Sequence, residues 1–95
     1  MSLVIVGGNE CMTRQYKELC SEYGCKAKIY PKMNAGLKDL GNPDLIVLFT
    51  STVSHKMVRC ALKGAETRIA RSHSSSMNAL RGILEEHACV PVRVR

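Results

Sequence analysis

The chain has 95 residues, 45% of them hydrophobic and 23% charged, which predicts one globular domain over residues 1–95 and excludes an intrinsically disordered chain. No apolar run approaches the roughly 20 residues of a membrane span, and the first residues lack the basic stretch of a signal peptide, so we expect no membrane partner and a cytoplasmic location. The net charge of +6 favours anionic partners, but no aromatic residue stands in a basic, strand-like run of the kind that stacks RNA bases, so nucleic acid is the least supported of these partners.

The first third of the chain predicts a strand, a turn and a helix. Residues 3–6 are continuously apolar, as expected of a parallel strand that is covered on both faces. Gly7-Gly8 turns the chain toward Asn9, which is a favourable N-cap residue. Apolar residues at spacings of three and four over residues 12–23 predict a helix, and Gly24 stands where a C-cap glycine belongs.

The rest of the chain continues this alternation of short apolar runs and helical periods. The strongest strand signal is the run over 45–49, the most hydrophobic stretch of the sequence. In chain order, the remaining predicted elements are a second strand over 25–30, a weak short helix within 32–40, the third strand over 45–49, a helix from His55 to Ala65, a fourth strand over 67–70, a helix over 77–87 and a possible fifth strand over 90–94.

Alternating strands and helices predict a small flavodoxin- or Rossmann-like three-layer α/β domain, with a parallel sheet of four to five strands in the order 2-1-3-4 and possibly 5. In such sheets, ligands bind beyond the carboxyl ends of the strands, near the point where the strand order reverses. The loops expected there span 7–12, 50–55 and 71–76, and they are also the richest in Gly, Ser, Thr and His. We therefore predict the functional site at this edge of the sheet.

Hydroxyl side chains gather before two of the predicted helices, in greater number than helix capping alone requires. Two neighbouring helix N-termini can bind an anion through amide groups, hydroxyls and their dipoles, and Arg71 can add a bidentate contact. Capping and turn formation alone are the alternative reading of the same residues. The residues predicted to bind a small anionic ligand are Gly7, Gly8, Asn9, Thr52, Ser54, His55, Arg71, Ser72, Ser74 and Ser75.

A divalent metal is the alternative to an anion, with His55, His73 and Cys11 as its ligands. Both histidines follow adjacent strands, and a thiol in the first turn of a helix is reactive. The chain has five cysteines and no C-x-x-C pair, which argues against a disulfide framework and a zinc knuckle. We therefore favour a small anion over a metal.

Signatures of common enzymes and cofactors are missing from the chain. There is no G-x-S-x-G elbow, no C-x5-R after Cys11, and Thr50 stands where a receiver domain needs an aspartate. G-x-G-x-x-G is absent, and the second strand ends at Tyr30-Pro31 without an acidic residue for a ribose. We therefore expect a non-catalytic ligand-binding or regulatory domain without a dinucleotide cofactor. A metal- or redox-responsive domain and a nucleic-acid accessory protein are the other two hypotheses.

The last residues, 90–95, alternate apolar and basic side chains, as a half-exposed edge strand does. Because unpaired strand edges tend to be covered, this pattern predicts a homodimer that pairs through the C-terminal strand.

Several of these motifs together resemble the bacterial family known as domain of unknown function 2325. The resemblance extends over almost the whole chain and implies the α/β fold and the three-loop site, but no established activity. In this chain, His73 and a serine run stand where many members have a glycine, so the resemblance implies no role for His73. The matching residues are Val4-Ile5-Val6-Gly7-Gly8, Tyr16, Gly24, Asp44, Val53-Ser54-His55, and Arg71-Ser72 with the serines that follow.

Overall fold

A four-stranded parallel sheet forms the centre of the computed structural model, which describes residues 2–32, 43–62 and 67–87. The strands are β1 (Ser2–Val6), β2 (Lys26–Tyr30), β3 (Leu45–Phe49) and β4 (Arg68–Ser72). They are hydrogen-bonded in the order β2-β1-β3-β4. This order confirms the flavodoxin-like arrangement predicted from the sequence, with β1 and β3 in the middle and β2 and β4 at the edges.

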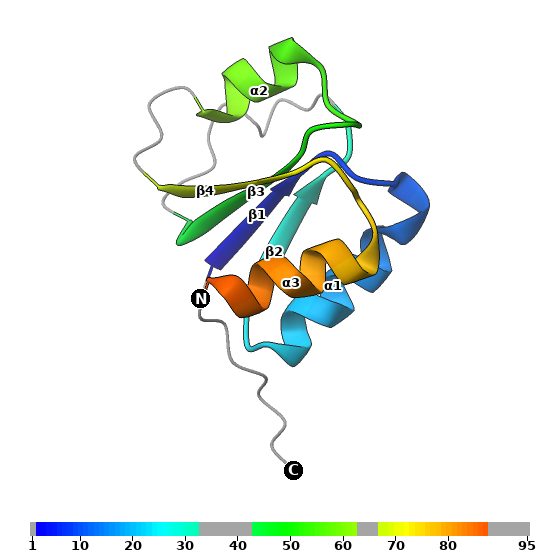
Figure 1. The fold of residues 1–95 in the computed structure, drawn as a ribbon, viewed down its shortest axis with the longest axis vertical. Coiled ribbons are helices and arrows are strands. Elements are labelled where there is room, and N and C mark those ends of the chain that lie inside the picture. The colour runs from blue at the N-terminus through cyan, green and yellow to red at the C-terminus, as the bar shows by residue number, and fades with distance from the viewer. Residues whose placement is uncertain (1, 33–42, 63–66, 88–95) are drawn as a thin grey trace.

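Helices cover both faces of the sheet, which gives the predicted three layers. Helix α1 (Thr13–Glu22), preceded by the 3-10 turn η1 (Glu10–Met12), and helix α3 (Met77–Glu86) lie on one face, while α2 (His55–Leu62) lies on the other (Figure 1). In the described ranges, no helix combines the length and the hydrophobicity needed to cross a bilayer.

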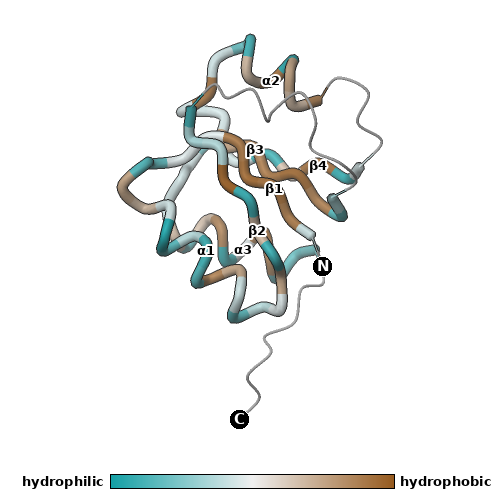
Figure 2. Tube along the Cα trace, turned by 180° about the vertical axis from the view of Figure 1, so that it is seen from behind, coloured by the Kyte–Doolittle hydropathy of each residue, from teal (hydrophilic) through white to brown (hydrophobic). Residues whose placement is uncertain are grey.

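Alternation of side chains along the strands divides the core into two parts, one under each helical layer. Figure 2 shows the hydrophobic residues concentrated on β1 and β3, as expected of strands that are buried on both faces. The strand residues that pack with α1 and α3 are Leu3, Ile5, Leu45, Val47, Phe49 and Ala70. Those that pack with Met57 and Ala61 of α2 are Val4, Val6, Ile46 and Leu48. We call these two sides of the sheet the α1–α3 side and the α2 side.

The boundaries of the fourth strand differ from the prediction. Strand β4 continues past Ala70 to Ser72 because Arg71 pairs with Leu48 and Ser72 with Phe49 of the neighbouring strand. The predicted polar loop over 71–76 is therefore shortened to the residues after Ser72. The predicted short helix within 32–40, the fifth strand over 90–94 and the dimer contact through that strand lie outside the described residues, apart from Lys32.

Candidate functional site: the carboxyl edge of the sheet

Three loops meet at the carboxyl edge of the sheet, and hydrogen bonds join them. The amide of Gly8, after β1, donates to Thr52 Oγ1, after β3, at 2.7 Å. The amide of Thr50 donates to the carbonyl of Ser72, at the end of β4, at 2.8 Å. The structure thus brings together the loops in which the sequence predicts the site.

Side chains of the β3 loop lie close against the Gly7-Gly8 turn. Gly7 and Gly8 have φ angles of +95° and +91°, in the region that favours glycine. A Cβ atom at Gly7 would lie 2.5 Å from Val53 Cγ1 and 2.7 Å from Thr52 Oγ1. The glycines therefore allow the two loops to pack closely, with Thr52 and Val53 directly beside Gly7.

Tyr16 of α1 links the first loop to the third, a role that its place in the helical pattern does not indicate. Its hydroxyl donates to the carbonyl of Ser75 at 2.6 Å and accepts from the amide of Asn9 at 3.2 Å. The side chain is fully buried, and its ring lies 5.5 Å from that of Phe49. The helical period places Tyr16 in the core, but nothing in the sequence indicates which carbonyl its hydroxyl reaches.

Most of the hydroxyl side chains predicted to bind the anion cap helices or stabilise turns. Ser54 Oγ accepts from the amide of Met57 at the start of α2, at 3.2 Å. Ser76 Oγ accepts from the amide of Ala79 at the start of α3, at 3.1 Å. In the loop before α3, Ser72 Oγ donates to the Ser74 carbonyl at 2.8 Å, and Ser74 Oγ donates to Ser76 Oγ at 3.1 Å and accepts from the amide of Ser76 at 3.2 Å. Asn9, likewise, caps η1 by accepting from the amide of Cys11 at 2.9 Å.

Three cationic or potentially cationic side chains at this edge have no such internal role. His55 begins α2, Arg71 stands near the end of β4, and His73 follows that strand; all are exposed. Within the described ranges, no hydrogen bond or ion pair uses the side chain of any of the three. Arg71 pairs in register with Leu48, which packs with α2, so Arg71 lies on the α2 side.

The metal-binding alternative gains no support from the arrangement of these side chains. Cys11 belongs to η1, on the α1–α3 side, whereas His55 begins the helix on the opposite face of the sheet. Among the residues that the structure describes, no three His, Cys, Asp or Glu side chains are grouped so as to hold a metal ion. His55, His73 and Cys11 are thus not brought together.

Comparison with known proteins identifies a family. The model of the family described as "Uncharacterized protein conserved in bacteria (DUF2325)" matches residues 2–87. Searches of curated proteins and of solved structures give no match. The match covers all the described strands and helices, in agreement with the motifs around Gly7-Gly8, Ser54-His55 and Arg71-Ser72. The chain therefore belongs to the bacterial family of domain of unknown function 2325.

Proposed function

We propose that this domain is a non-catalytic binding module that holds a small anionic group at the carboxyl edge of the sheet, on the α2 side. The observation that supports this function is the exposed Arg71 guanidinium, which has no carboxylate partner among the described residues, whereas the hydroxyls of Ser54, Ser72, Ser74 and Ser76 are engaged in caps and turns. A guanidinium presents paired N–H donors that match a carboxylate or a phosphate.

His55 and the start of α2 supplement Arg71 in this proposal. The first amides of a helix carry a partial positive charge, which favours an anion nearby. Ser54 occupies the amide of Met57, so the anion is expected to contact the imidazole of His55 and the guanidinium of Arg71 rather than the capping hydroxyl. Of the residues predicted from the sequence, this proposal retains Arg71 and His55 as ligand contacts. It gives Gly7, Gly8 and Thr52 a structural role.

Inorganic phosphate is a suitable first probe, and its binding can be measured from the shifts of backbone NMR signals as phosphate is added. We expect saturable shifts for residues near Arg71, and Arg71→Ala should weaken phosphate binding about 10- to 100-fold, the scale of a hydrogen bond to a charged group. His55→Ala should weaken it less. Arg68→Ala is the matched control, because it removes the same charge from the opposite end of β4.

Two results would contradict the proposal. One is the absence of saturable shifts at the carboxyl edge when phosphate is added. The other is an equal loss of binding in the Arg68 and Arg71 variants, which would mean that phosphate responds to net charge rather than to this edge of the sheet.

A further inference from the structure

Charged side chains are distributed unequally between the two sides of the sheet. Lys26 and Lys28 of β2 pair in register with Ser2 and Val4, so both lysines lie on the α2 side. Helix α2 packs its apolar residues on the sheet and leaves three side chains exposed, His55, Lys56 and Arg59. Together with Arg71, the cations of the α2 side are thus Lys26, Lys28, Lys56 and Arg59.

Acidic side chains lie elsewhere in the described ranges. Those of η1, α1 and α3, on the α1–α3 side, are Glu10, Glu18, Glu22, Glu85 and Glu86. Glu18 pairs with Arg14 at 3.5 Å, and Glu10 pairs with Lys32 at 3.0 Å. Asp44, just before β3, has its carboxylate 2.7 Å from the amide of Ser2. The described part of the α2 side is therefore strongly basic, although the sequence shows its cations only as scattered residues.

Strand β2 also places an aromatic ring on this basic side. Tyr30 pairs in register with Val6 and packs partly against the core under α2, so it shares the α2 side with Lys26 and Lys28. The sequence interpretation that no aromatic residue stands in a basic strand is therefore wrong. The segment Lys26–Tyr30 alternates with a period of two, so Lys26, Lys28 and Tyr30 face one side of the sheet while Ala27 and Ile29 face the other.

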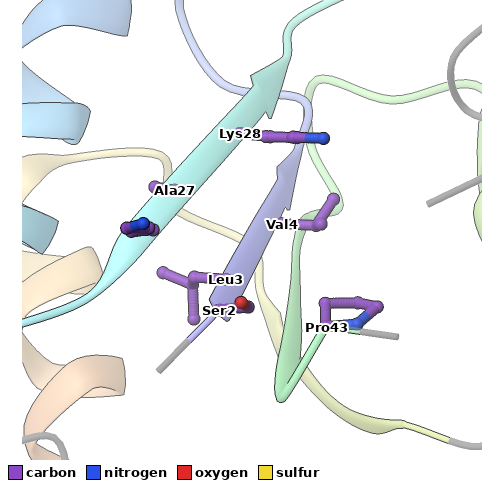
Figure 3. A pocket seen from close by; sticks show the side chains of 7 residues that line it. Ser2, Leu3, Val4, Ala27, Lys28 and Pro43 are labelled. Carbon is purple, nitrogen blue, oxygen red and sulfur yellow. The ribbon is translucent and has the colours of Figure 1, made fainter. Parts of the chain in front are cut away.

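A pocket of about 320 Å³ opens between the amino halves of β1 and β2, beside both lysines. In Figure 3, Lys28, Val4 and Pro43 lie on one side of β1, and Leu3 points to the other. The volume is within the usual range for a small-molecule site. The pocket is lined by Ser2, Leu3, Val4, Lys26, Ala27, Lys28 and Pro43, so apolar groups lie next to ammonium groups.

We propose that the α2 side binds single-stranded nucleic acid, with phosphates at Lys26 and Lys28 and a base in the pocket that these lysines flank. The exposed cations of α2, Lys56 and Arg59, lie on the same side and extend the surface available to the phosphate backbone. Basic surfaces that follow the backbone, combined with contacts to unstacked bases, are typical of proteins that bind single strands.

The structure favours a single strand over the other polyanions. A duplex keeps its bases stacked and paired, so it can use the lysines but not the pocket. An anionic membrane surface would call for an exposed apolar face beside the cations, whereas α2 turns Met57 and Ala61 into the core under it. This inference does not rest on the small-anion site, which uses Arg71 and His55.

The test measures binding of the full chain to a short fluorescent oligothymidylate by anisotropy over a range of salt concentrations. Lys26→Ala/Lys28→Ala should lose about tenfold or more in affinity, and the slope of log K against log salt should fall by roughly 1.4, because each lost single-strand contact contributes about 0.7. Arg14→Ala/Lys17→Ala is the control, since it removes two exposed charges from α1. Its affinity should stay within about twofold of the unmodified chain.

Two further probes test the pocket and the partner class. An abasic strand of equal length keeps the phosphates but should bind several-fold more weakly, and a duplex should bind more weakly than the single strand. Lys26→Gln/Lys28→Gln, which preserves the side-chain stems, provides a second variant if the alanine form unfolds. The proposal is overturned if the abasic strand or the duplex binds as tightly as the single strand. It is also overturned if the Lys26/Lys28 and Arg14/Lys17 variants lose equal affinity, or if the protein binds phosphatidylserine vesicles but not the oligonucleotide. Because phosphate titration reports on Arg71 separately, failure here is distinguishable from failure of the small-anion proposal.

Discussion

At Gly7, backbone conformation and packing both restrict the choice of residue. Its φ of +95° strains any other residue, and a Cβ there would meet Val53 Cγ1 at 2.5 Å. Gly7→Ala should therefore lower the free energy of unfolding by about 2–4 kcal/mol, from backbone strain and overpacking together. Urea denaturation followed by circular dichroism measures this change.

Gly82 provides the matched control for Gly7. It lies inside α3 in a position where an added Cβ would meet no atom within 4 Å. Gly82→Ala should raise the free energy of unfolding by about 0.5–1 kcal/mol, because alanine loses less backbone entropy in a helix. Equal effects of the two substitutions would contradict the structural role assigned to the Gly7-Gly8 turn.

Tyr23 provides a pH-dependent contribution to stability. Its hydroxyl donates to Glu85 Oε2 at 2.8 Å, and this hydrogen bond, with burial and the charge of Glu85, raises the pKa of Tyr23 above its ordinary value of 10.0. The bond therefore stabilises the fold fully below 10.0, and its contribution is lost as the pH rises through the raised pKa.

Comparing Tyr23→Phe with the unmodified chain isolates this contribution, since the ring is kept. The variant should unfold at lower urea concentration at neutral pH, and the difference should disappear at a pH above the raised pKa of Tyr23. A difference that stays constant into the alkaline range would show that the phenol proton is not involved.

At the level of the elements, Thr52 joins β1 to β3 beyond the end of the ladder. Its Oγ1 accepts from the amide of Gly8 at 2.7 Å and donates to the carbonyl of Phe49 at 3.0 Å. Thr52→Val keeps the shape but leaves the amide of Gly8 without its acceptor, which should cost about 1–3 kcal/mol. Thr52→Ser keeps the hydroxyl and should cost clearly less. Similar losses in both variants, measured by thermal unfolding, would argue that packing rather than the hydrogen bond matters.

The sequence predicts the elements better than their contacts. The apolar run over Leu45–Phe49 matches β3 at both ends, because a strand buried on both faces leaves a continuous signal. The strand predicted over 67–70 ends two residues before β4 does, since the end of β4 depends on pairing with Phe49 and not on its own hydrophobicity.

For the candidate site, too, the sequence predicts the location better than the contacts of individual side chains. Clustering of the three loops follows from parallel topology and can be predicted without coordinates. Which hydroxyl caps a helix, and which polar side chain has no internal partner, depends on tertiary hydrogen bonds such as that of Tyr16 with Ser75. The sequence therefore indicates the edge of the sheet but cannot separate Ser54, a capping residue, from Arg71.

For the whole molecule, electrostatic effects on stability depend more on where the charges lie than on the net charge of +6. Like charges on the α2 side repel one another, whereas the cations of the α1–α3 side lie among carboxylates. Lys28→Gln should therefore stabilise the protein at low ionic strength, and Arg14→Gln, which removes the ion pair with Glu18 on α1, should destabilise it.

Each effect should be a few tenths of a kcal/mol, the usual scale for exposed charges, and both should fade as salt shortens the screening length to about 3 Å near 1 M. The measurement is the difference in melting temperature between each variant and the unmodified chain, at low and at high sodium chloride. Because Lys28 also flanks the pocket, adding oligothymidylate at low salt should stabilise the unmodified chain more than Lys28→Gln. Shifts of the same sign in both variants, unchanged by salt, would mean that the two sides of the sheet do not differ electrostatically.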